Sequence, residues 1–152
     1  MPQVTKSVLV PYSAAAMFDL VDAVERYPDF LPWCGSSHVL ERSPLITVAA
    51  IEIQYLGVRQ SFTTANEKQG QEWMHLSLRE GPFRQLNGHW HFRQLAPEAC
   101  KVELYLEYAF SNRVLEGAIG PVFGMIAETL IERFVERADA LYGRAERENG
   151  GG

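Results

Sequence analysis

One long segment near the carboxyl end, residues 114–142, limits what this chain can fold into more than any other feature. Its apolar side chains recur at steps of three and four positions, which predicts an α-helix with one apolar face. At ~1.5 Å per residue the helix would be on the order of 40 Å long, so the rest of the chain must supply a large apolar surface against it. The apolar positions are Leu115, Ile119, Val122, Phe123, Ile126, Leu130, Ile131, Phe134, Ala138 and Leu141.

Three glycines and a proline interrupt the start of this predicted helix, at Gly117, Gly120, Pro121 and Gly124. Each glycine lowers helix stability by up to ~1 kcal/mol relative to alanine, so their presence needs a reason. The sequence leaves two interpretations. The first turns are kinked, or the helix is kept slim because another segment passes closely beneath it.

Between residues 37 and 110 the apolar period changes to two, which predicts β-strands. Glycine and proline occur at short intervals in this region and predict tight turns between the strands. Consecutive strands are therefore expected to pair as an antiparallel meander. Alternation places Trp90 and Phe92 on an apolar face, and His89 and His91 on the opposite, polar face. The six predicted strands cover residues 37–41, 45–56, 58–66, 72–79, 85–95 and 100–110.

The first third of the chain predicts a strand over residues 4–10 and a short helix over residues 14–22, with Ser13 as its N-cap. A further turn is expected at residues 24–27. Residues 27–35 contain two prolines and a glycine but also five apolar side chains, those of Tyr27, Phe30, Leu31, Trp33 and Cys34. A loop of this kind must pack on the core or line a site. The whole order predicts an α+β fold, in which a curved sheet of about seven strands wraps around the long helix.

Length and composition predict one domain over residues 1–147, followed by a disordered tail at residues 148–152. The net charge of −5 argues against a nonspecific nucleic-acid binder, so no DNA partner is expected. No apolar run of ~20 residues and no signal peptide is evident. Cys34 and Cys100 are far apart, which argues against a disulfide framework or zinc site and fits a reducing cytoplasm. A monomer is expected.

Three motifs of this chain are distinctive. Residues 27–34 read YPDFLPWC, and residues 81–92 read GPFRQLNGHWHF. The third motif, in the region of the long helix, comprises residues 110–113 (FSNR), Leu115, Gly120, Phe123, Phe134, Arg137 and Ala138. These motifs resemble the coenzyme Q-binding and ribosome association toxin RatA family of the START superfamily, whose fold is the helix grip. Residues 57–64 (GVRQSFTT) also fit, and the resemblance spans residues 3–145.

The resemblance implies a non-enzymatic protein that binds ubiquinone or a similar isoprenoid lipid in an internal cavity and supports respiratory electron transport. Transient contact with the inner membrane surface would fit this role. The alternative that it implies is a toxin that binds the large ribosomal subunit and blocks subunit association. A second alternative is a polyketide cyclase-like enzyme. Ubiquinone would be a bound ligand, and no cofactor is expected.

Aromatic and aliphatic side chains that face the predicted interior are the candidates for a ligand cavity, although any one of them could be ordinary core. We expect its mouth where the Pro32–Trp33 loop lies beside Gly120 and Pro121. The candidate cavity residues are Phe30, Trp33, Tyr55, Phe62, Phe83, Trp90, Phe92, Phe123 and Ile126.

A ribosomal contact would require clustered basic residues, and Arg79, Arg84 and Arg113 are the candidates at one rim of the sheet. Scattered solvated charge is the alternative interpretation. His89 and His91 share a strand face, a spacing that can bind a metal, and His75 is expected on the same face. Without a third ligand nearby, we interpret them as solvent-facing residues and predict no metal site. No motif for hydrolysis or phosphate binding occurs, so no catalytic residue is predicted.

Overall fold

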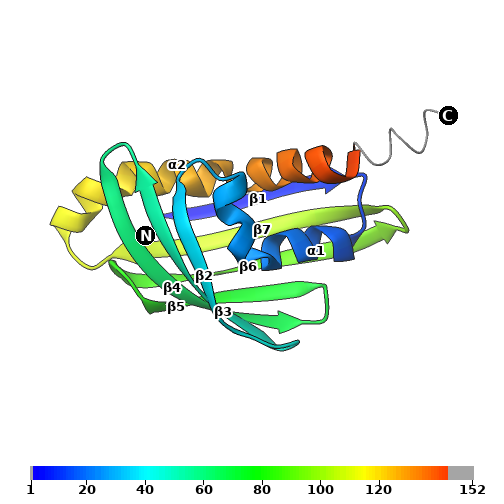
Figure 1. The fold of residues 1–152 in the computed structure, drawn as a ribbon, viewed down its shortest axis with the longest axis horizontal. Helices are drawn as coiled ribbons and strands as arrows, with labels where there is room; N and C mark the ends of the chain where they lie inside the picture. Colours follow the sequence, from blue (N-terminus) through cyan, green and yellow to red (C-terminus); the bar gives the residue numbers. More distant parts are fainter. Residues whose placement is uncertain (1, 144–152) are drawn as a thin grey trace.

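The computed structural model describes residues 2–143, so the predicted tail at residues 148–152 lies outside the described residues. A seven-stranded antiparallel sheet and one long helix dominate the structure (Figure 1). The elements are β1 (Gln3–Val10), α1 (Ala14–Asp22), the 3-10 helix η1 (Val24–Asp29), β2 (Cys34–Arg42), β3 (Ile46–Tyr55), β4 (Val58–Gln69), β5 (Trp73–Glu80), β6 (Phe83–Ala96), β7 (Ala99–Phe110), α2 (Arg113–Ala138) and the π-helical turn η2 (Asp139–Gly143).

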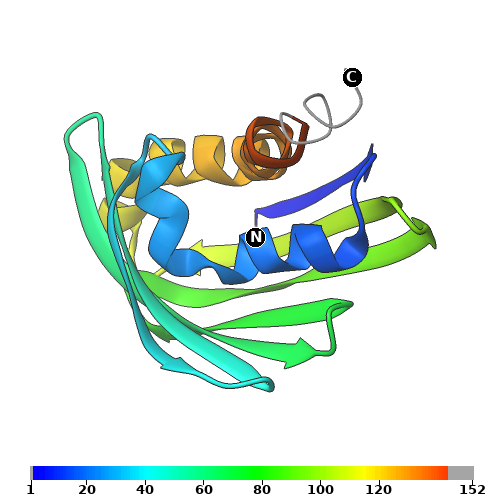
Figure 2. The same cartoon turned by 45° about the vertical axis from the view of Figure 1, so that its right-hand side comes forward.

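The strands follow the order β1-β7-β6-β5-β4-β3-β2, so the six strands after η1 form a continuous meander. The first strand closes the far edge by pairing with the last, from Gln3 opposite Glu107 to Val10 opposite Cys100. The sheet curls around α2, and the two short helices fill the remaining side (Figure 2). The predicted α+β helix-grip architecture is therefore confirmed.

Local sequence explains the two short helices. Ser13 Oγ accepts a hydrogen bond from Ala16 N at 3.1 Å, as its predicted N-cap role requires. The α1 helix buries Met17, Phe18 and Val21 against the sheet. The next segment forms only a 3-10 turn, because Pro28 lacks an N–H group and cannot continue an α-helix. The Tyr27 hydroxyl donates to the carbonyl of Val21 and ties this turn to α1.

The long helix starts at Asn112, whose side chain accepts from Leu115 N at 2.9 Å. Its buried face includes Ile119, Phe123 and Phe134. The prediction that Leu141 continues this face is wrong, because the chain turns π-helical from Asp139 and Leu141 is 42% exposed. The change in residues per turn rotates it away from the sheet.

Two of the helix glycines lie over aromatic residues of β7. A Cβ at Gly120 would be 3.8 Å from the Phe110 ring, and one at Gly124 would be 3.8 Å from the Tyr108 hydroxyl. Gly117 faces open space. Because 3.8 Å is an ordinary van der Waals distance, alanine would fit at Gly120 and Gly124 as well, so the second interpretation, a helix kept slim above another segment, is not supported at any of the three glycines.

The helical segment Arg113–Gly143 contains an 18-residue window with a mean hydropathy of 1.5, so by length and composition it could cross a membrane. The expectation that no segment is apolar enough is wrong by this measure. In the structure this helix packs across the sheet, and its apolar face supplies core residues such as Ile131 and Phe134.

Candidate functional site

An internal cavity of about 80 Å³ lies between the concave face of the sheet, η1 and α2. Fourteen of its sixteen lining residues are aliphatic or aromatic, and five come from α2. The lining residues are Val24, Tyr27, Trp33, Ile51, Phe62, Thr64, Asn66, Leu76, Leu86, Trp90, Leu106, Phe123, Ile126, Ala127, Leu130 and Phe134. A deep apolar space with few polar groups is typical of a site for an apolar ligand.

Five of the nine candidate cavity residues share this space: Trp33, Phe62, Trp90, Phe123 and Ile126. They come from the segment before β2, from β4 and β6, and from α2. The Trp33 backbone is fixed by its carbonyl, which accepts a hydrogen bond from Gln54 N of β3 at 2.8 Å. The structure thus brings together side chains separated by up to about two thirds of the chain.

The other four candidates lie outside the cavity lining. Phe92 packs behind it, with its ring 5.5 Å from Phe18 of α1. Tyr55 is half-buried at the end of β3. Phe83 belongs to an aromatic cluster beside the cavity, and Phe30 packs on α2 farther along the helix.

The segment before Trp33 packs on a later part of α2 than the Gly120–Pro121 region where the mouth was expected. The Phe30 ring lies 5.4 Å from Phe134, and the guanidinium of Arg137 lies 5.1 Å above it. Gly120 and Pro121 are about four turns earlier on the helix, roughly 20 Å away at ~1.5 Å per residue. They line a separate surface groove instead. The loop that leads to Trp33 therefore meets the later turns of α2.

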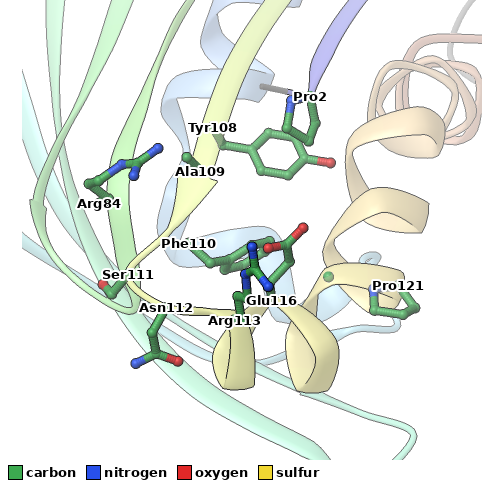
Figure 3. Close-up of a pocket in the computed structure, with 11 residues that line it drawn as sticks. Pro2, Arg84, Tyr108, Ala109, Phe110, Ser111, Asn112, Arg113, Glu116 and Pro121 are labelled. Atoms are coloured by element: carbon green, nitrogen blue, oxygen red, sulfur yellow. The ribbon is translucent and has the colours of Figure 1, made fainter.

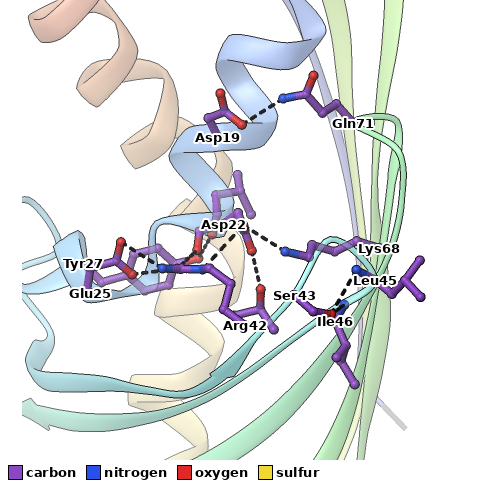
Figure 4. Close-up of polar contacts among 12 residues, drawn as sticks. Asp19, Asp22, Glu25, Tyr27, Arg42, Ser43, Leu45, Ile46, Lys68 and Gln71 are labelled. Atoms are coloured by element: carbon purple, nitrogen blue, oxygen red, sulfur yellow. Dashed lines mark hydrogen bonds and ion pairs between the residues drawn. The ribbon is translucent and has the colours of Figure 1, made fainter.

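Two polar cavity residues, Thr64 and Asn66, were missed from the sequence. They follow Phe62 on β4 at steps of two, so the alternation that placed Phe62 inside also places them inside. Thr64 Oγ1 donates to Asn66 Oδ1 at 3.0 Å, and both residues are 4% exposed. The same alternation reaches Lys68, which is buried beyond the cavity and paired with Asp22 at 3.1 Å (Figure 4).

No charged residue, histidine or cysteine is among the residues that line the cavity within the described part of the chain. The nearest thiol in sequence, Cys34, follows Trp33, and burial raises its pKa to about 11. It therefore stays protonated at neutral pH. These surroundings supply no evident general base for proton-transfer chemistry.

A surface groove of about 640 Å³ lies at the other end of α2 (Figure 3). Two of the three candidate ribosome-contact residues line it, Arg84 from β6 and Arg113 from the first turn of α2. Pro2, Tyr108 and Glu116 are also part of its wall. Arg79 is exposed on β5 and does not line this groove.

Aromatic rings separate the groove from the cavity. Phe83 lies 4.9 Å from Phe123 and 5.8 Å from Phe62, which both line the cavity. It also lies 5.0 Å from Phe110, which lines the groove. Gly81 makes this packing possible: its φ is +152°, and a Cβ there would be 2.7 Å from Phe62 Cβ. The glycine of the GPF motif is thus required by its backbone conformation and by the close approach of Phe62.

Comparisons with known proteins agree with this architecture. The family model described as "Polyketide cyclase / dehydrase and lipid transport" matches residues 10–135. The chain belongs to this family. Within it, a ribosome association toxin RatA from Vibrio cholerae serotype O1 is 43% identical over 143 residues, covering 94% of this chain and 99% of that protein.

Two further proteins are similar to this chain at lower identity. The mitochondrial coenzyme Q-binding protein coq10 of Schizosaccharomyces pombe is 26% identical over 149 residues, covering 94% of this chain and 90% of that protein. A solved START superfamily protein from Mycobacterium smegmatis has the same fold, with a TM-score of 0.76 at 21% identity. It covers 91% of this chain and 98% of that one. The resemblance predicted from the three motifs is therefore confirmed at the level of the family.

In this family member, the histidines of the outer sheet face pack around a tryptophan. The Trp73 ring stacks on His91 at 3.8 Å and lies 5.4 Å from His89. Because Trp73 covers it, His91 is only 7% exposed, so the expectation that it faces solvent is wrong. Across the described residues, no group of three or more His, Cys, Asp or Glu is arranged to hold a metal ion.

Proposed function

We propose that this family member is a non-enzymatic binding protein for an apolar ligand of the isoprenoid quinone type. The observation that carries the proposal is the internal cavity, with its almost wholly apolar wall and its small polar element at Thr64 and Asn66. Removing apolar ligand surface from water would contribute ~25 cal/mol per Å² to binding. The coenzyme Q-binding relative supports this ligand class.

The cavity is small, and this determines how binding must proceed. At about 80 Å³ it is smaller than the ~150 Å³ cavities that accept benzene, so a quinone ring requires the cavity to widen. We assign this movement to α2, because it provides five lining residues and its first half is weakened by glycines. Ala127, fully buried on α2, is one of the residues that would move with it.

Tryptophan fluorescence tests the proposal directly. Trp33 and Trp90 line the cavity, whereas Trp73 lies on the outer face of the sheet. In a Trp73→Phe variant, a short-chain ubiquinone should quench the emission of the two remaining tryptophans and reach saturation at one equivalent. Quenching that rises linearly with quinone concentration, as for free tryptophan, would show that the cavity is not occupied.

A second candidate function is association with the large ribosomal subunit. Two observations favour it: the 43% identity to a ribosome association toxin, and the groove that joins Arg84 and Arg113. Arginine pairs favour phosphate, and contacts of this kind depend strongly on salt. We extend the proposed contact to Arg79, which is exposed on β5.

Cosedimentation with purified large subunits tests this second candidate. The double variant Arg84→Glu and Arg113→Glu should sediment less than the unmodified protein at low salt, and Arg79→Glu reports how far the contact extends. Moderate salt should reduce the cosedimentation of the unmodified protein more than that of the variants, since the unmodified protein makes the most phosphate contacts. Equal sedimentation of all variants at both salt concentrations would remove the groove from consideration, while quinone binding would be unaffected.

A further inference from the structure

One buried polar atom has no partner in this protein. The Trp33 side chain is 4% exposed, and its Nε1 is the only buried side-chain nitrogen or oxygen in residues 2–143 without a hydrogen-bond partner. An orphaned buried donor is costly and uncommon in native structures, and such groups often mark a functional site. Trp33 lines the internal cavity, so a molecule that enters the cavity is placed beside this side chain.

A second donor lies on the same cavity wall. Asn66 Oδ1 accepts from Thr64 Oγ1, and the donor group of this side chain is its amide nitrogen. The remaining hydroxyl, on Tyr27, is already engaged with the Val21 carbonyl. Trp33 and Asn66 line one cavity of about 80 Å³, so both side chains border the space that a small head group would occupy.

The charges around the cavity select between head groups. No charged side chain lines it in the described part of the chain, and the buried Lys68 beyond Asn66 is neutralised by Asp22. A carboxylate placed there would be desolvated without a counter-charge, which is strongly unfavourable. A neutral carbonyl oxygen would receive the available hydrogen bonds at no such cost.

We propose that the cavity is selective for neutral amphipathic ligands with a carbonyl oxygen, and that Trp33 Nε1 and the Asn66 amide donate hydrogen bonds to that head group. This inference rests on the proposed binding of an apolar ligand. It adds a polar recognition element and excludes anionic lipids such as fatty acids. Quinones and esters both satisfy it.

Matched ligands separate recognition of the head group from apolar packing. By equilibrium dialysis, the unmodified protein should bind decylubiquinone more tightly than decylbenzene, which lacks the oxygens. Trp33→Phe and Asn66→Leu should each weaken decylubiquinone binding about five- to tenfold, the effect of one hydrogen bond, and change decylbenzene binding less than about twofold. Methyl dodecanoate should bind more tightly than the dodecanoate anion.

The outcomes distinguish this inference from the function on which it rests. If the protein binds neither decyl compound, the proposed function fails and the inference fails with it. If both compounds bind equally and the variants weaken them equally, the residues act by packing alone, so the inference is overturned while ligand binding stands. Tight binding of dodecanoate would overturn the selectivity for neutral ligands. The comparison of methyl dodecanoate with dodecanoate uses only the unmodified protein, so it tests the selectivity for neutral ligands even if Trp33→Phe folds poorly.

Discussion

The Asp22 carboxylate lies 3.1 Å from the Lys68 ammonium, and the lysine side chain is only 6% exposed (Figure 4). Asp22 also accepts a hydrogen bond from Thr47 Oγ1 at 2.7 Å, and its backbone carbonyl accepts one from Arg42 at 2.7 Å. The end of α1 is thereby joined to β2, β3 and β4. The Asp22–Lys68 pair holds the short helix against β4, the strand that carries Thr64 and Asn66.

Asp22→Asn should destabilise the protein by about 3 kcal/mol or more, because it leaves the buried Lys68 ammonium without its anion. The matched control is Glu128→Gln, which breaks the exposed pair between Glu128 and Lys6, 2.9 Å apart. An exposed pair contributes less than about 1 kcal/mol. Urea denaturation of both variants measures the difference, and equal losses would show that burial of the Asp22 pair has no energetic consequence.

Two glycine-to-alanine substitutions should have opposite effects on stability. A Cβ at Gly88 of β6 would be 2.1 Å from the Tyr105 carbonyl oxygen, so Gly88→Ala forces the backbone apart and should cost about 2 kcal/mol or more. Gly117 faces open space on α2, so Gly117→Ala should stabilise by up to about 1 kcal/mol. Thermal unfolding monitored by circular dichroism shows whether each substitution raises or lowers the melting temperature. Destabilisation by Gly117→Ala would mean that the glycine is required where the structure shows free space.

Acidification should destabilise the outer sheet face through His89. Burial lowers its pKa, and the nearby His75 and His91 lower it further, against an opposing effect of Glu103. The unfolded chain, with a histidine pKa of ~6.5, therefore binds the proton more readily than the folded one. Stability is fully present above that pH and declines as the pH falls through the folded-state pKa. His89→Asn should reduce the fall in melting temperature between pH 7.5 and pH 5; an unchanged fall would exclude His89 as the source.

The sequence was sufficient for the architecture because local signals agreed with one another. Ser13 marked the start of α1, short turns marked the meander, and the three- and four-residue spacing marked α2. The positions of Trp33, Phe62 and Trp90 in one interior followed from alternation and from the resemblance to the family. Thr64 and Asn66 obeyed the same alternation, but polar residues are not normally assigned to a core.

Other features depend on tertiary contacts that no local pattern contains. His91 lies on a polar strand face, and it is buried by the stacking of Trp73 from the neighbouring strand together with a contact to Glu72 at 3.3 Å. The location of the loop before Trp33 depends on the contact between Phe30 and Phe134, more than a hundred residues apart. The lack of a partner for Trp33 Nε1 is likewise a property of the packed interior.

The central claim, that the cavity holds an apolar ligand, can be tested by filling it. Ala127 is fully buried and lines the cavity, whereas Ala118 is exposed on the same helix, so Ala127→Leu and Ala118→Leu form a matched pair. The most direct measurement is mass spectrometry of lipids extracted from the purified unmodified protein and from both variants, with thermal melts to show that each is folded. We predict that the unmodified protein and Ala118→Leu carry an isoprenoid quinone and that Ala127→Leu carries little or none. Equal quinone content in the two folded variants would contradict the claim, as would its absence from all three proteins.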